Sequence, residues 1–189
     1  MSINEDKWRL FIAVLLPPEI KQKLETWCSE QKTRLDFKKW VHTEDYHITV
    51  QFLGDTAPGR LDELLAALTR AAKGIIGPLE MEAAGIGTFG RPASPSVLWA
   101  GVRGEVAGLE SLHSRVTSEN RALGFVPEER RFSPHITLAR KFREGARLDP
   151  AVLQTQPDFG RWKADRLVIY RTHMHKRPMY EVVGSALLT

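Results

Sequence analysis

The sequence predicts an α+β protein built from two related halves, and three observations lead to this fold class. The tetrapeptide His47-Ile-Thr-Val50 recurs as His135-Ile-Thr-Leu138. Each copy follows the same series of elements, which is a short apolar strand, an amphipathic helix and a second strand that carries the histidine. The intervals also match, because Leu10 precedes His47 by 37 residues and Val97 precedes His135 by 38. An internal duplication of about 90 residues explains these matches most simply.

The composition of the 189-residue chain is close to that of an average globular protein. Its 42% hydrophobic and 26% charged residues argue against a disordered or fibrous chain. The apolar stretches, such as Leu10–Leu16, are far shorter than the roughly 20 residues that cross a bilayer. The polar first residues also lack the pattern of a secretory signal, so we expect a cytoplasmic protein. The single cysteine, Cys28, excludes an internal disulfide framework and a cysteine-based zinc cage.

The net charge of +4 is a mild excess of basic residues. It is compatible with a partner that bears phosphate, but it is weaker than the charge of a dedicated nucleic-acid-binding protein. Basic residues cluster at Glu128–Arg131, Arg140–Arg143 and Arg171–Arg177. Most such clusters are solvated surfaces, so charge alone does not identify a binding site.

The first half begins with the apolar run Leu10–Leu16, which predicts a buried strand because it is short and two prolines follow it. The predicted elements after it are a helix that starts at Pro18, strands at Phe37–Val41 and His47–Leu53, and a helix that opens at Pro58-Gly59.

The second half repeats this series. Leu79, Met81 and Ala83 alternate with glutamates, which is the pattern of a half-buried strand. The segment Gly85–Pro95 is rich in glycine and proline and predicts a loop. The predicted elements after it are a strand at Val97–Val102, a helix from Val106 that Gly124 ends, a strand at Phe132–Leu138, and a hairpin of Arg166–Tyr170 with Tyr180–Leu188.

The repeated tetrapeptide is the candidate catalytic site. Side chains at positions i and i+2 of a strand share a face, so His47 lies with Thr49 and His135 with Thr137. Two imidazoles in one cleft suit general acid–base catalysis near neutral pH. The threonine hydroxyls can donate hydrogen bonds to oxygens that gain negative charge. A singly charged cyclic phosphodiester that water attacks at phosphorus fits this set, and the reaction requires no metal.

Two other interpretations compete with catalysis. A single His-x-Thr on a strand is more often a core or cross-strand hydrogen-bonding pair, but two copies in duplicated contexts favour a shared site. A metal site is weaker, because neither motif has an acidic residue at ligand spacing. His173 and His175 could hold a metal on a strand face, but their proline and basic neighbours favour a solvated loop. We therefore predict no metal and no cofactor.

Several segments beyond the two motifs resemble one known family. They are Arg9–Val14, Trp40-Val41, His47–Gly54, Gly87–Gly90, Val97–Val102 and Ser133–Arg140. In this order they are similar to the 2H phosphoesterase superfamily and, within it, to the bacterial and archaeal RNA 2′,3′-cyclic phosphodiesterases, also called 2′-5′ RNA ligases (the LigT/ThpR type). The resemblance covers nearly the whole chain. It implies one domain, 1–189, with two pseudo-symmetric lobes in which two antiparallel β-sheets form a central cleft and helices pack outside.

The same resemblance implies hydrolysis of an RNA-terminal 2′,3′-cyclic phosphate to a 2′-phosphomonoester. His47 would be the proton donor to the leaving 3′ oxygen, and His135 would be the proton acceptor that activates water. Thr49 and Thr137 would bind phosphate oxygens. The residues alone do not assign the direction of proton transfer, because the two motifs are nearly equivalent.

Three further residues are candidates for substrate binding. Arg140 follows the second motif as in members of the family, and a guanidinium is well suited to phosphate. Strict strand alternation puts Arg140 opposite His135, so only a bulge or a strand end after Thr137 would turn it inward. Phe89 and Tyr46 are candidates for stacking on the terminal base, with ordinary packing as the competing interpretation.

The sequence leaves the exact substrate and two other functions open. RNA 3′ ends and small cyclic nucleotides both fit as substrates. Reversible 2′-5′ ligation of RNA ends would use the same site with a ribose hydroxyl in place of water. A non-catalytic module that binds RNA ends is an alternative of another class, against which the four intact motif residues argue. A self-contained two-lobed chain predicts a monomer without a membrane partner.

Overall fold

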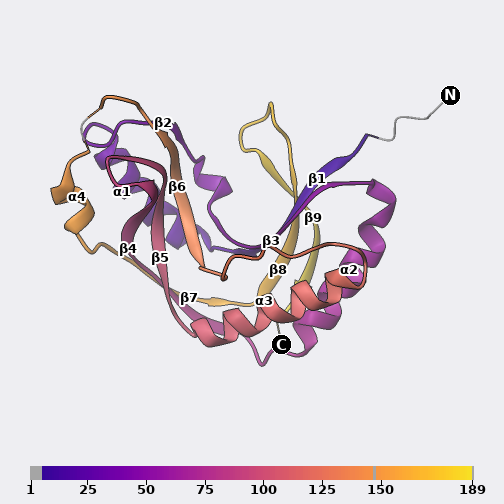
Figure 1. The fold of residues 1–189 in the computed structure, drawn as a ribbon. Coiled ribbons are helices and arrows are strands. Elements are labelled where there is room, and N and C mark those ends of the chain that lie inside the picture. The colour runs from indigo at the N-terminus through magenta and orange to yellow at the C-terminus, as the bar shows by residue number, and fades with distance from the viewer. Residues whose placement is uncertain (1–5, 147, 189) are drawn as a thin grey trace.

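The computed structural model describes residues 6–146 and 148–188 (Figure 1). The strands are β1 (Trp8–Leu15), β2 (Phe37–Trp40), β3 (His47–Thr56), β4 (Leu79–Arg91), β5 (Ser94–Gly104), β6 (His135–Phe142), β7 (Asp158–Ala164), β8 (Arg166–Thr172) and β9 (Tyr180–Leu187). The helices are α1 (Pro18–Gln31), α2 (Leu61–Lys73), α3 (Val106–Arg121) and the short α4 (Pro150–Gln154). The predicted α+β class is confirmed, and in both halves a strand and a helix precede the histidine strand.

The described strands form one sheet, in the order β7-β4-β5-β6-β3-β1-β8-β9, and β2 pairs with β6. The two halves of the sheet meet where β3 contacts β6, through the single residue pair Ile48 and Ile136. From Ala139 onward β6 pairs with β2 instead, so β3 diverges from it and the sheet curls strongly (Figure 1). The expectation of two separate sheets is therefore corrected. The two halves stay joined because Ile48 and Ile136 are both fully buried in a common core.

The segment Gly85–Pro95, which was expected to be a loop, instead continues β4 and β5 to a two-residue turn. Gly87 pairs with Trp99, and a Cβ atom at Gly87 would lie 2.2 Å from the indole ring. The loop prediction is wrong because glycine in a strand also marks a close approach of another group.

The helices lie on the outer side of the curled sheet (Figure 1). Helix α2 contacts β9 and packs against α3, whereas α1 contacts β7. Strand β1 is covered on both faces, since Ile12 enters the main core and Phe11 enters a second cluster with Val168 and Tyr170. This double burial explains its continuous apolar sequence. In the described part of the chain, no helix is long and apolar enough to cross a membrane.

The two histidine strands share an irregularity. In each, burial alternates for four residues and then two neighbours are both buried, which are Val50-Gln51 in β3 and Leu138-Ala139 in β6. The pairing register with the adjacent strand shifts at the same places, as at a β-bulge. The residue five positions after each histidine, Phe52 or Arg140, therefore returns to the face of that histidine.

Candidate active site

The two histidine motifs lie side by side where the halves of the sheet meet. Because β3 and β6 are antiparallel with Ile48 opposite Ile136, the register brings His47 next to Thr137 and Thr49 next to His135. The isoleucines are buried, so alternation turns the histidines and threonines to the opposite face. The structure thus brings the four predicted motif residues together.

Both imidazoles are held by the same backbone contact. The Nδ1–H of His47 donates to the carbonyl oxygen of Asp45 at 2.7 Å, and that of His135 donates to the carbonyl oxygen of Ser133 at 2.8 Å. A carbonyl oxygen can only accept, so Nδ1 carries the proton in each neutral ring. The Nε2 atom of each ring is therefore the nitrogen that can gain or lose a proton.

His47 lies in an aromatic enclosure. Its ring is 5.0 Å from Phe11, 5.3 Å from Tyr180 and 5.8 Å from Tyr170, measured between ring centroids. The pKa of His47 is lowered from 6.5 to about 4, chiefly by burial and in smaller part by the charge of Arg140, whereas the contact with Asp45 opposes the shift. The free protein therefore holds His47 neutral at pH 7.

His135 has a more open environment. The Phe89 ring meets it edge-on with centroids 4.9 Å apart, and Phe89 in turn packs on Trp99 at 5.5 Å. Burial also lowers the pKa of His135, the bond to Ser133 opposes the shift, and Arg140 adds to it. A neutral imidazole that is accessible to water is suited to accept a proton.

The hydroxyl of Thr49 is already engaged with His47, since Oγ1 lies 2.8 Å from Nε2. The hydroxyl donates to Nε2 while that nitrogen is unprotonated, and accepts from it after protonation. Thr137 is half-buried on the same face of β6. Either hydroxyl can turn to donate to an oxygen bound between the histidines.

Arg140 lies on the side of the histidines because the bulge at Leu138-Ala139 breaks the strict alternation. Its side chain is exposed, and its charge lowers the pKa of both His47 and His135. Lys141, the next residue, adopts a φ of 60°, in the left-handed region, so the strand geometry changes again directly after Arg140. A guanidinium in this place can bind a phosphate located between the imidazoles.

Tyr46 does not face the site. Its side chain is 2% exposed and belongs to the main core, where it lies near the Cys28 thiol. Burial raises the pKa of Tyr46 and raises that of Cys28 to about 11. The expectation that Tyr46 stacks on a base is therefore corrected, because a side chain next to His47 in the chain points away from it.

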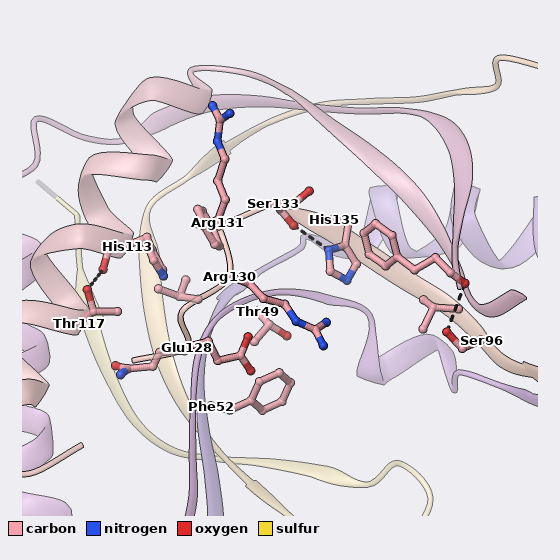
Figure 2. A pocket seen from close by; sticks show the side chains of 15 residues that line it. Thr49, Phe52, Ser96, His113, Thr117, Glu128, Arg130, Arg131, Ser133 and His135 are labelled. Carbon is pink, nitrogen blue, oxygen red and sulfur yellow. Dashed lines mark hydrogen bonds between the residues drawn. The ribbon is translucent and has the colours of Figure 1, made fainter. Parts of the chain in front are cut away.

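A cavity of about 430 Å³ opens beside Thr49 and His135 (Figure 2). Phe52 and Phe89 line it and are 57% and 37% exposed. The Phe89 ring is thus partly exposed, and its stacking on a base stays a prediction. Phe52 was not among the predicted site residues, although it follows His47 by five residues just as Arg140 follows His135. The repeated spacing was the signal in the sequence that could have identified Phe52. The bulge explains it, because it turns the residue five positions after each histidine to the face of that histidine.

Of the histidines outside the motifs, His113 lines the cavity, whereas the two that were considered as metal ligands lie elsewhere in the chain. His173 and His175 lie in the connection from β8 to β9, where Nε2 of His173 is 3.2 Å from the carboxylate of Glu181. Within residues 6–146 and 148–188, no three His, Cys, Asp or Glu side chains are grouped so that they could hold a metal ion.

This site lies in a chain that matches a known family over most of its length. The family model for LigT like phosphoesterases matches residues 14–99 and 102–180. The protein therefore belongs to the LigT-like phosphoesterase family, a group of 2H phosphoesterases, as the motif resemblance predicted.

The relatives agree on an activity. The chain is 40% identical over 177 residues to an RNA 2′,3′-cyclic phosphodiesterase of Geobacillus stearothermophilus, and the match covers 93% of this chain and 55% of that protein. It is 30% identical over 173 residues to an RNA 2′,3′-cyclic phosphodiesterase of Bacillus subtilis, with 92% of each covered. The chain thus spans about half the length of the first relative and most of the second.

Solved structures share the fold. The protein TT0787 of Thermus thermophilus superposes with a TM-score of 0.77 at 26% identity, covering 95% of this chain and 97% of that one. Escherichia coli LigT, solved in complex with 3′-AMP, superposes with a TM-score of 0.75 at 25% identity, covering 97% and 99%.

Proposed function

We propose that this protein hydrolyses the 2′,3′-cyclic phosphate at an RNA 3′ end to a 2′-phosphomonoester, by metal-independent general acid–base catalysis at His47 and His135. One observation carries the proposal. In both imidazoles, Nδ1–H donates a hydrogen bond to the carbonyl oxygen two residues earlier. The two Nε2 atoms, which lie on one face of the sheet, are therefore the nitrogens that can transfer protons. The RNA 2′,3′-cyclic phosphodiesterases among the relatives support the choice of substrate and reaction.

The reaction moves one proton at each histidine. Nε2 of His135 accepts a proton from the water that attacks phosphorus, while the bond between phosphorus and the 3′ oxygen breaks. Nε2–H of His47 gives its proton to that departing oxygen. The product carries a phosphate on the 2′ oxygen and a free 3′ hydroxyl. His135 suits the acceptor role because it is the more open ring, and the enclosure of His47 makes its protonated form a strong acid.

The remaining residues of the site bind the substrate. Arg140 neutralises the phosphate as negative charge develops on its oxygens, and the hydroxyls of Thr49 and Thr137 donate to those oxygens. The phosphate anion also favours a proton on His47, which offsets the effect of burial on its pKa. Phe52 and Phe89 offer exposed rings on which the terminal base can stack.

We also infer that the two halves of the fold are duplicated lobes of one domain. Three features support this. Each histidine strand starts with the motif, each imidazole has the same backbone anchor, and each strand has its bulge at the same offset. The duplication explains why the site contains two imidazoles with the same anchor, and the position that Arg140 occupies in one half is Phe52 in the other.

Reversible 2′-5′ ligation would use the same groups, with a ribose hydroxyl in place of water. A module that only binds RNA ends would need neither two Nε2 atoms available for proton transfer nor the hydrogen bond between His47 and Thr49. The relatives that are named RNA 2′,3′-cyclic phosphodiesterases favour hydrolysis over both alternatives.

Product analysis tests this proposal. The protein is incubated with a short RNA that ends in a 2′,3′-cyclic phosphate, with EDTA present, and chromatography separates the products. We expect complete conversion to the 2′-phosphate. A 3′-phosphate product would contradict the assignment of the leaving oxygen, and loss of activity in EDTA would contradict metal independence. Joined RNA ends would favour ligation, and bound but unreacted RNA would favour the binding module.

A further inference from the structure

We propose that the cavity beside the histidines contains a second phosphate subsite, centred on Arg130, which binds the phosphodiester that links the terminal nucleotide of an RNA to the nucleotide before it. This inference rests on the function proposed above, because it takes the cyclic phosphate to lie between His47 and His135. It makes an RNA chain, rather than a cyclic mononucleotide, the preferred substrate class.

Arg130 lies in the segment between α3 and β6 and lines the same cavity as Thr49 and His135. In Figure 2 the Arg130 side chain extends across the cavity toward Thr49 and Phe52, whereas the neighbouring Arg131 extends in another direction. One cavity is therefore lined both by His135, which takes part in the reaction, and by the Arg130 guanidinium, which has no role in the proposed mechanism.

The charge of Arg130 is available to an anion. Its side chain is exposed, and no ion pair within the described residues includes it. Of the described side chains that line the cavity, Glu128 is the acidic one, and Figure 2 shows it at the same end of the cavity as Arg130. With Arg131 also in the lining, this end of the cavity has a positive balance.

The segment that carries Arg130 is fixed on both sides. On one side, the guanidinium of Arg60 lies over the Phe125 ring at 4.7 Å from its centroid. On the other, the Phe132 ring stacks on His113 with centroids 4.2 Å apart and an interplanar angle of 3°. The next residue, Ser133, holds Nδ1 of His135. Arg130 is thus positioned relative to His135, so both can act on one bound chain.

The position of Arg130 indicates which anion it binds. A cyclic mononucleotide has one phosphate, which the mechanism places between the histidines beside Arg140. A guanidinium further along the cavity requires a second anionic group in the same ligand. In RNA, the phosphodiester on the 5′ side of the terminal nucleotide supplies this group, and arginine binds phosphate through paired N–H donors.

A comparison of three substrates tests the proposal. They are a nucleoside 2′,3′-cyclic phosphate, a dinucleotide that ends in the same cyclic phosphate, and that dinucleotide with a neutral methylphosphonate linkage. We expect kcat/KM to be about tenfold higher for the natural dinucleotide than for the other two. In Arg130→Gln, this ratio should fall to near one. Arg121→Gln removes an exposed arginine outside the cavity and should keep the ratio of the parent protein.

The outcomes separate this proposal from the proposed function. Equal turnover of all three substrates by the parent protein, or an unchanged ratio in Arg130→Gln, would overturn the subsite while leaving the hydrolysis intact. If no substrate is cleaved, the proposed function is wrong, and the subsite is then tested by measuring binding affinities instead of turnover. A dinucleotide with a 2′-phosphate end should then bind about tenfold more tightly than a nucleoside 2′-phosphate, and equal binding would overturn the proposal.

Discussion

At the scale of single residues, the two histidines have the same backbone anchor but different surroundings. Three aromatic rings enclose His47, whereas His135 meets the edge of Phe89 and borders the cavity. Burial and the charge of Arg140 lower the pKa of both rings. The surroundings thus set the proton affinity of two groups that the sequence presents as equivalents.

These pKa shifts predict the pH dependence of the reaction. The mechanism needs His47 protonated and His135 neutral, and His47 loses its proton as pH rises through its lowered pKa. The bell-shaped profile of kcat/KM, which reports the free enzyme, should therefore have its maximum below pH 6.5, the ordinary histidine value. The profile of kcat should lie at higher pH, because the bound phosphate raises the pKa of His47.

Arg140 provides the check on this prediction. Arg140→Gln removes a positive charge near both rings, so it should raise both pKa values and move the kcat/KM maximum to higher pH, while lowering the rate. A profile that does not move, or a parent maximum above pH 7, would contradict the electrostatic account.

Phe52 is the residue we expect to bind the terminal base. Stacking of a base on an aromatic ring contributes about 1–3 kcal/mol. Phe52→Ala should therefore raise KM about tenfold for an RNA substrate, with kcat changed much less, and Phe52→Tyr should restore binding. Steady-state kinetics with the cyclic-phosphate dinucleotide measure this. An unchanged KM in Phe52→Ala would exclude the ring from the binding site.

At the scale of elements, a β-bulge in each histidine strand decides which side chains reach the site. Strict alternation alone would put Arg140 on the face opposite His135, so the sequence made its inward position depend on a bulge, and it gave no reason to select Phe52. A bulge depends on how the strand pairs with its neighbour. The register of β3 shifts opposite Ile12 and Ala13 of β1, and that of β6 shifts opposite Leu98 and Trp99 of β5. That pairing is a tertiary property, so the sequence pattern of one strand does not contain it.

The close packing of β4 on β5 gives a prediction about Gly87. A methyl group there would lie 2.2 Å from the Trp99 ring, and Phe89 packs between Trp99 and His135. Gly87→Ala should therefore destabilise the protein by about 2 kcal/mol and lower kcat through displacement of Phe89. Gly59→Ala is the matched control, because nothing lies within 4 Å of its Cβ position. Urea unfolding and kinetics of both variants test this, and equal stability of the two would contradict it.

At the scale of the whole molecule, the duplicated pattern was the most informative part of the sequence. It predicted the order of elements in both halves and the meeting of His47, Thr49, His135 and Thr137. The pattern did not predict that the halves would remain one sheet, because this depends on how Ile48 and Ile136 pack against each other. Tyr46 was misplaced for a similar reason, since its burial against Cys28 is a long-range contact.

Both motifs come from one chain, so a second copy is not needed to complete the site. We therefore expect a monomer of 21.4 kDa in solution, which light scattering coupled to size-exclusion chromatography would measure. A stable dimer would contradict this prediction. The cytoplasmic location also stays a prediction, and fractionation of cells that produce the protein would test it.

The central claim is that two imidazoles act as acid and base, and substitution of each histidine tests it most directly. Turnover of a cyclic-phosphate RNA would be measured for His47→Ala and for His135→Ala, with circular dichroism to verify folding and Arg121→Gln as the control. Because each proton transfer contributes about 10²- to 10⁴-fold, we predict that each alanine variant loses roughly a thousandfold in kcat. If either folded variant stays within a few-fold of the parent protein, the two-histidine mechanism is wrong.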